Sequence, residues 1–230
     1  MIRIALAIVA AAALALVPDA AAAKARARAV AKDWSKSFSV TPEGGFRMGN
    51  PKAKIELVEY GSLTCSHCRH FAETALKPLV AKYVRTGKAS YEYRSFVLNG
   101  IDLAATLVAR CGGPARFFPI ADELFAKQPL WLGKITDAES EKLNALPEDQ
   151  MMLGVAKAAG LIPIAAAHGI PAAKAETCLK SETAADELSK MAQAAADRGV
   201  EGTPTFFVNG KQVPAHDWAT LEPFLKDAGS

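Results

Sequence analysis

The sequence predicts an α/β fold in which a small mixed sheet is interrupted by a helical subdomain. Three observations support this prediction. A strand, a helix and a second strand follow one another over residues 54–98, helical patterning then continues to about residue 198, and β-rich sequence returns over residues 202–213. Strands and helices in this order favour a layered α/β architecture.

The predicted strand–helix–strand unit begins with residues 54–60, KIELVEY, in which Glu59 shares a face with two aliphatic residues. From Cys65 onward, apolar residues recur every three to four positions, which predicts an amphipathic helix that is kinked at Pro78. Residues 90–98, SYEYRSFVL, form the second predicted strand. Such a unit is normally parallel and right-handed.

The segments on either side of this unit have simpler patterns. Turn residues over 38–54 predict a short hairpin, and Asn209-Gly210 predicts a second one because this dipeptide favours tight β-turns. A final helix is expected over 217–227. The helices predicted between the two β-rich regions are 102–111, 115–127, 147–160, 171–180 and 183–198, with breaks at Gly112-Gly113, Pro129–Gly133, Pro163 and Gly169.

Length and composition are consistent with one large domain that carries an insertion. The chain has 230 residues, of which 50% are hydrophobic and 22% are charged. We expect a lead-in over residues 24–44, a main domain over 45–228 and a helical insertion over about 100–183. The net charge of +3 is small and both signs are interspersed, so no nucleic-acid partner is expected.

The first 23 residues have the pattern of a signal peptide. Arg3 precedes an uncharged run from Ile4 to Val17, and small residues follow, so cleavage is expected after Ala22 or Ala23. The apolar run is shorter than the roughly 20 residues that span a membrane. The alternative is a retained anchor helix. Export would place the four cysteines where disulfides are permitted.

Two of the cysteines, Cys65 and Cys68, lie in TCSHC, where the first predicted strand gives way to a helix. The free N–H groups and the dipole of a helix N-terminus favour a thiolate at Cys65, and the thiolate is the reactive form. We expect Cys65 to be exposed and reactive and Cys68 to resolve its mixed disulfides. His67 stands between them and is expected to contact the Cys65 sulfur or to act as a nearby cation.

A cysteine pair with this spacing has other possible uses. Zinc sites usually take four ligands, and His67 and His70 are possible partners of the two cysteines. However, His67 lies between the cysteines on a tight turn, and no second ligand cluster is evident in the sequence. A purely structural bridge is the other alternative. At a strand-to-helix junction inside a strand–helix–strand unit, the pair indicates thioredoxin-like redox chemistry instead.

A second candidate feature is Thr203-Pro204, which lies just before the β-rich run near the end of the chain. A cis peptide before proline costs only about 0.5–1 kcal/mol relative to trans. In the cis form, Thr203 would offer its backbone to an extended substrate close to Cys65. The alternative is an ordinary trans proline in a turn.

The order of these parts resembles the DsbA-like family of exported thioredoxin-fold thiol:disulfide oxidoreductases. The resemblance covers about residues 45–228 and is carried by TCSHC at a helix start and by GTPTFFVNGK late in the chain. It implies a thioredoxin-like fold with an inserted all-helical subdomain. The family's cysteine pair, its histidine and its cis-proline fall on Cys65, Cys68, His67 and Pro204. Thr203 resembles the residue before that proline in isomerase-type and other DsbA-like members.

Members of this family tend to carry a buried acidic residue at the end of the strand before the cysteine pair. Glu59 matches that place, so we expect it to be partly buried, to titrate at a raised pKa and to relay protons for Cys68. The alternative is an ordinary surface glutamate.

The remaining cysteines are Cys111 and Cys178, each near the end of a predicted helix. Four cysteines allow three pairings. Some DsbA-like proteins have a second, non-catalytic disulfide, and this resemblance favours a structural bridge between Cys111 and Cys178. Two buried free thiols are the alternative.

The resulting expectation is a periplasmic oxidoreductase that introduces disulfides into exported proteins, with the Cys65–Cys68 disulfide as its redox centre and no other cofactor. Expected partners are unfolded or partly folded exported polypeptides and, as the family implies, a membrane quinone-linked thiol oxidase. We expect a monomer, since the segment before residue 45 is short for a dimerisation domain. The alternatives are a disulfide isomerase or reductase of the same fold, and a non-catalytic metal-binding carrier.

Overall fold

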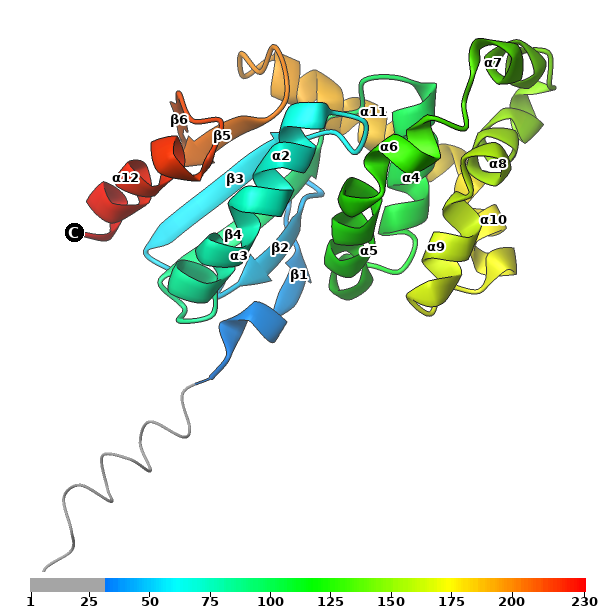
Figure 1. Cartoon of the computed structure of the whole chain (residues 1–230). Coiled ribbons are helices and arrows are strands. Elements are labelled where there is room, and N and C mark those ends of the chain that lie inside the picture. Colours follow the sequence, from blue (N-terminus) through cyan, green and yellow to red (C-terminus); the bar gives the residue numbers. More distant parts are fainter. Residues whose placement is uncertain (1–31) are drawn as a thin grey trace, which may run out of the picture. The chain divides into compact units, whose positions relative to one another are not determined.

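The computed structural model describes residues 32–230, and its compact unit spans Asp33–Ser230. The predicted signal peptide, residues 1–23, and the first part of the predicted lead-in lie outside the described residues. Within residues 32–230 the chain forms one six-stranded sheet of order β1-β2-β4-β3-β5-β6 (Figure 1). Its strands are β1 (Phe38–Val40), β2 (Phe46–Gly49), β3 (Ile55–Gly61), β4 (Ala89–Ser95), β5 (Thr205–Val208) and β6 (Lys211–Val213).

The sheet is mixed, as the sequence predicts. Strands β3 and β4 are parallel, with Glu59 opposite Tyr93, and the other neighbouring strands are antiparallel. Both predicted hairpins are confirmed: β1 pairs with β2 after the short 3-10 helix η1 (Trp34–Lys36), and β5 pairs with β6 across Asn209-Gly210. Asn209 and Gly210 both have positive φ, as this tight turn requires.

The helix between β3 and β4 consists of three pieces. It begins as α2 (Ser66–Thr74), continues as α3 (Leu76–Leu79) and ends in the π-helical turn η2 (Val80–Val84). The sequence predicts a kink at Pro78, and the structure shows an interruption of the helix at Ala75. Pro78 has no N–H to donate to the Thr74 carbonyl, so the hydrogen-bond ladder breaks one turn before the proline.

The chain is helical between β4 and β5, and Figure 1 shows α4 to α10 beside the sheet. Two predicted breaks are wrong. Pro163 and Pro129 each lie in the first turn of a helix, where a backbone N–H has no intrahelical partner to lose. The helices are α4 (Gly100–Arg110), α5 (Pro114–Ala126), α6 (Gln128–Leu132), α7 (Asp137–Asn144), α8 (Glu148–Ala159), α9 (Leu161–Ala167), α10 (Ala172–Leu179) and α11 (Glu182–Ala196).

The core divides over the two faces of the sheet. On one face Leu57 packs with α2 and with α12 (Trp218–Gly229), and the rings of Phe71 and Phe206 lie 4.5 Å apart. On the other face, Tyr60 and Phe207 form a smaller cluster with residues of and after α11. The buried ring of Phe71 anchors α2 to the sheet directly below its first turn.

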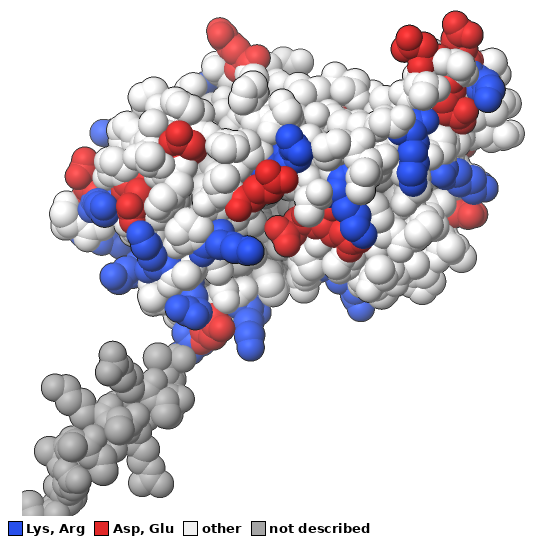
Figure 2. All heavy atoms as spheres, viewed as in Figure 1, with Lys and Arg blue, Asp and Glu red and all other residues white. Residues whose placement is uncertain are grey.

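The surface is mixed in charge, and acidic and basic side chains are interspersed on the face that Figure 2 shows. Among the described residues, no single helix is long and apolar enough to cross a membrane; α8 and α9 meet the criteria only as a pair bent by 72°.

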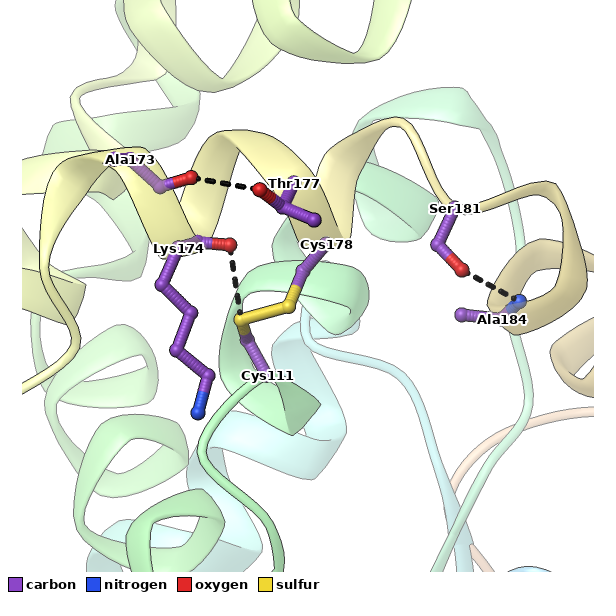
Figure 3. The surroundings of a disulfide bond; sticks show 7 residues. All are labelled: Cys111, Ala173, Lys174, Thr177, Cys178, Ser181 and Ala184. Atoms are coloured by element: carbon purple, nitrogen blue, oxygen red, sulfur yellow. Dashed lines mark hydrogen bonds between the residues drawn. A yellow bond between two sulfur atoms is a disulfide. The ribbon is translucent and has the colours of Figure 1, made fainter.

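A disulfide joins Cys111 and Cys178 in the helical segment (Figure 3). Cys111 follows the last residue of α4, and Cys178 lies in the last turn of α10. The Cys111 sulfur also lies 3.4 Å from the carbonyl oxygen of Lys174. The bond therefore ties the first helix of this segment to α10 across 67 residues of chain.

We expect replacement of both cysteines, Cys111→Ser with Cys178→Ser, to lower the free energy of unfolding by about 4 kcal/mol, because the unfolded chain regains the entropy of a long open loop. Urea unfolding of the variant and the parent, both with Cys65 and Cys68 oxidised, measures this loss. Equal stability of the two proteins would show that the bond contributes nothing to the fold.

Candidate active site

The first residue of the candidate site, Cys65, is the N-cap of α2. The strand β3 ends at Gly61, residues 62–64 turn the chain, and the Cys65 sulfur accepts a hydrogen bond from the Cys68 N–H at 3.3 Å. The sulfur thus occupies the place that a hydroxyl or carboxylate oxygen takes in other helix caps. Cys65 is half-buried, whereas Cys68 has no exposed surface. The two sulfurs are unbonded in this structure.

The surroundings of Cys65 lower the pKa of its thiol to about 5. The largest contribution is a hydrogen bond from the Cys68 thiol, and the backbone N–H groups of Cys68 and His67 add to it, while partial burial opposes it. The sequence pattern predicts this acidity from the helix N-terminus and from His67, but it does not predict the contribution of the Cys68 thiol. A hydrogen bond to the charged form of a thiol favours that form and so lowers the pKa.

The second cysteine has the opposite character. Burial raises the pKa of Cys68 strongly, and both its hydrogen bond to Cys65 and the nearby Glu59 carboxyl raise it further. A thiol in this position keeps its proton over the physiological pH range. The two members of the pair are therefore one readily ionised sulfur at the surface and one protonated sulfur in the core.

Glu59 lies on β3 and is 1% exposed, so the alternative of a surface glutamate is wrong. Burial raises the pKa of its carboxyl to about 8. The Tyr91 hydroxyl donates to Glu59 Oε2 at 2.6 Å, which limits this rise, and the charge of Cys65 adds to it. Glu59 is thus a carboxyl that is mostly protonated at neutral pH.

The loop before β5 also contacts Cys65. The peptide bond between Thr203 and Pro204 is cis, and the Thr203 carbonyl oxygen accepts from the Cys65 thiol at 3.2 Å. Strand β5 follows directly and pairs with β3, with Thr205 opposite Tyr60. Residues 138 positions apart in the sequence thereby meet at one sulfur.

His67 lies in the first turn of α2 with its ring exposed. The contact that lowers the Cys65 pKa comes from its backbone N–H, whereas the sequence pattern predicts one from the ring. His70, the other proposed metal ligand, is also exposed. Within residues 32–230 no three His, Cys, Asp or Glu side chains converge to hold a metal ion, so the metal-carrier alternative gains no ligand set there.

Two buried polar residues of the helical segment reach the loop before Cys65, and neither is predicted from the sequence. Asp102 Oδ1 accepts from the Leu63 N–H at 3.0 Å, and Gln128 Nε2 donates to the carbonyl oxygens of Leu63 and Cys65 at 2.8 and 3.0 Å. Asn99 three positions before Asp102 marks the cap of α4 in the sequence, but no local signal indicates either long-range contact.

Two exposed leucines lie on the segments that contact this loop. Leu98 is 48% exposed and its N–H donates to Asp102 Oδ2 at 3.0 Å. Leu130 is 70% exposed and lies in α6, two residues beyond Gln128. Large apolar side chains with this exposure are few among the described residues, and these two flank the elements that hold Cys65.

Comparison with known proteins agrees with this geometry. The sequence profile described as thioredoxin matches residues 41–227. A Rickettsia felis protein, whose name of protein-disulfide oxidoreductase was assigned by inference, is 32% identical to this chain over 167 residues. These residues are 72% of this chain and 53% of that protein. A Rickettsia prowazekii protein of the same name is 33% identical over 72% of this chain and 54% of its own length. The chain thus spans about half the length of these curated relatives.

Solved structures show the same fold. A protein-disulfide isomerase from Novosphingobium aromaticivorans is 31% identical, with a TM-score of 0.74 over 80% of this chain and 96% of that one. Wolbachia pipientis alpha-DsbA1 is 21% identical, with a TM-score of 0.62 over 82% of this chain and 92% of that one. The chain belongs to the thioredoxin family and has the fold of its DsbA-like members, a mixed thioredoxin-like sheet with an insert of helices, α5 to α10.

Proposed function

We propose that this protein is a thiol:disulfide oxidoreductase that introduces disulfides into exported proteins by exchange at Cys65 and Cys68. The observation that carries the proposal is the inequality of the two sulfurs. The pKa of Cys65 is about 5 at the helix start, whereas the pKa of the buried Cys68 is raised. A stable thiolate favours the reduced pair, so the oxidised pair readily accepts electrons.

The first step is an attack on the oxidised pair. A substrate thiolate attacks the Cys65 sulfur, the Cys65–Cys68 bond breaks, and a mixed disulfide between substrate and Cys65 forms. Cys68 departs as a thiolate in an apolar site, where its charge is costly. Glu59, protonated at neutral pH, supplies the proton that neutralises it, and Tyr91 holds the resulting carboxylate.

The second step releases the product. Another thiolate of the substrate attacks the substrate sulfur of the mixed disulfide, and Cys65 leaves. A thiol of low pKa is a good leaving group, so this step is favoured at Cys65. The balance is one new substrate disulfide, a Cys65 thiolate, a Cys68 thiol and two protons, which leave the two substrate thiols as they ionise. One of these protons restores the proton that Glu59 gave to Cys68, and the other is released to solvent.

The substrate side of the site is suited to an extended, unfolded segment. The backbone of Thr203 lies beside Cys65 just before β5, and this extended segment is the proposed place of strand-like pairing with a substrate chain. Leu98 and Leu130 offer apolar contacts on the helical side. A folded protein would present neither a free backbone nor buried apolar side chains, so unfolded or partly folded polypeptides are the proposed substrates.

The proposed place of action is the periplasm, after removal of residues 1–23. The support is the signal-like pattern at the N-terminus, together with a disulfide between Cys111 and Cys178, a bond that forms and persists in oxidising compartments. Reoxidation of the reduced pair needs an electron acceptor, and a membrane quinone-linked thiol oxidase is the proposed partner. The proposed working form is a monomer that uses no cofactor other than its own cysteine pair and binds no nucleic acid.

Disulfide isomerisation is the second candidate. It is favoured by the 31% identity to a Novosphingobium protein that is named an isomerase. An isomerase attacks wrong disulfides with the reduced pair, whereas an oxidase must be oxidised first. The reduction potential therefore separates the two candidates.

Cys68→Ala is the direct test of exchange at Cys65. Without a resolving sulfur, mixed disulfides between substrate and Cys65 persist, and we expect adducts with exported polypeptides that a thiol reductant releases. Mass spectrometry of these adducts identifies the substrates. Cys65→Ala with Cys68→Ala is the matched control and should trap nothing. Absence of reductant-sensitive adducts from the single variant would refute the proposed exchange.

Titration of the reduced protein tests the electrostatic basis. The ultraviolet absorbance of the thiolate should report a pKa of about 5 for Cys65, and equilibration with glutathione should give a potential more oxidising than the roughly −270 mV of thioredoxin. An ordinary thiol pKa at Cys65 would remove the basis for an electron-accepting pair. A low pKa with a potential at or below that of thioredoxin would favour the isomerase or reductase.

Glu59→Gln tests the buried carboxyl. Because the folded-state pKa of Glu59 is raised to about 8 from 4.5, its contribution to stability is full below pH 4.5 and is lost as the pH rises through about 8. We therefore expect the stability of the oxidised variant relative to the oxidised parent to increase from acidic to alkaline pH, by about 1.4 kcal/mol for each pH unit that separates the folded and unfolded pKa values. Urea unfolding across this range, with no thiols titrating, measures the difference. If the free energies of unfolding of the variant and the parent changed in parallel with pH, this would contradict a raised pKa of Glu59.

A further inference from the structure

The loop that delivers Cys65 to the start of α2 is held by two buried residues that the exchange steps above do not use. Asp102 of α4 is fully buried and Gln128 of α6 is 3% exposed. Burial of a carboxylate and an amide is costly unless every polar atom has a hydrogen-bond partner. The partners of these two side chains therefore indicate their role in the structure.

Asp102 uses both oxygens of its carboxylate on backbone groups. Oδ1 accepts from the Leu63 N–H and Oδ2 accepts from the Leu98 N–H, each at 3.0 Å. Its own N–H donates to Asn99 Oδ1 at 2.9 Å, which fixes it at the capped start of α4. The carboxylate therefore joins the loop before Cys65 to the loop after β4 from a rigid helix end.

Gln128 holds the same loop from the other side. Its side-chain amide nitrogen donates to the Leu63 carbonyl at 2.8 Å and to the Cys65 carbonyl at 3.0 Å. The Cys65 carbonyl also accepts from the Arg69 N–H at 3.1 Å, the helical bond that begins α2. Both backbone groups of Leu63 are thus bound by side chains from the helical segment, and Gln128 bonds to Cys65 itself.

We infer that Asp102 and Gln128 are positioning residues, which hold the Cys65 sulfur in register with the first N–H groups of α2 from outside the thioredoxin-like sheet. A hydrogen bond to a thiolate weakens steeply as its geometry degrades. If the loop relaxes, the Cys65 sulfur loses part of its contact with the Cys68 thiol and N–H, and its thiolate loses stabilisation. Helices α4 and α6 then contribute to the chemistry of the cysteine pair through these two side chains. This inference rests on the proposed function, since a lowered pKa of Cys65 serves the exchange of disulfides.

Three variants test the inference: Asp102→Ala removes both acceptors, Asp102→Asn keeps one acceptor oxygen, and Gln128→Leu removes both donors at similar size. Leu143→Ala is the matched control, because Leu143 is buried in α7 and packs near Gly154 of α8 without a contact to the loop. The readouts are the ionisation of Cys65 by thiolate absorbance, the potential against glutathione, and urea unfolding.

We expect Asp102→Ala and Gln128→Leu each to raise the pKa of Cys65 by about one unit, a tenfold lower ionisation constant, which corresponds to a potential about 30 mV less oxidising. Asp102→Asn should give a smaller shift of the same sign. Leu143→Ala should lose stability with the Cys65 pKa and the potential unchanged.

Two outcomes overturn the inference. In the first, the Asp102 and Gln128 variants lose stability while the pKa of Cys65 stays unchanged. In the second, Leu143→Ala shifts the pKa of Cys65 as much as these variants do. If Asp102→Ala does not fold, Asp102→Asn and Gln128→Leu decide. These readouts need no substrate. A shifted pKa in a protein without exchange activity would refute only the proposed function, and an unshifted pKa in an active enzyme would refute only the positioning role.

Discussion

The structure depends on one asymmetric hydrogen-bonded pair, the Cys65 sulfur that accepts from the Cys68 N–H and thiol. Cys65 must be at the surface and at the first turn of α2, and Cys68 must be one turn deeper in the core. Packing of Phe71 against Phe206 holds that turn against the sheet. A helix placed elsewhere would make the two sulfurs alike, and equal sulfurs would have no division between an attacking and a resolving role.

Around this pair the fold places groups that act on different forms of the sulfurs. Amide and thiol donors stabilise the charged form of Cys65, whereas the buried Glu59 carboxyl, to which the Tyr91 hydroxyl donates, is the proposed source of protons for Cys68. The Thr203 carbonyl occupies the open side of Cys65. The site therefore combines a half-buried sulfur, Cys65, with a buried sulfur and a buried carboxyl, Cys68 and Glu59.

Much of this arrangement follows from local patterns in the sequence. The change from a two-residue to a three-to-four-residue period at Cys65 predicts the junction of strand and helix, and Asn209-Gly210 predicts the last hairpin. The short helix α6 was missed because Pro129 resembles a break, and α7 because it is mostly polar. The contacts of Asp102 and Gln128 with the loop cross 39 and 63 residues, and they depend on how helices dock, which no local period encodes.

The bond between Cys111 and Cys178 has a consequence for biosynthesis. Along the chain the four cysteines occur in the order 65, 68, 111 and 178, so the two pairs are consecutive and neither loop encloses or crosses the other. A polypeptide that emerges from its N-terminus therefore exposes Cys65 and Cys68 before Cys111 and Cys178. Pairing each cysteine with the next free one would give the Cys111–Cys178 bond and the proposed Cys65–Cys68 bond without reshuffling.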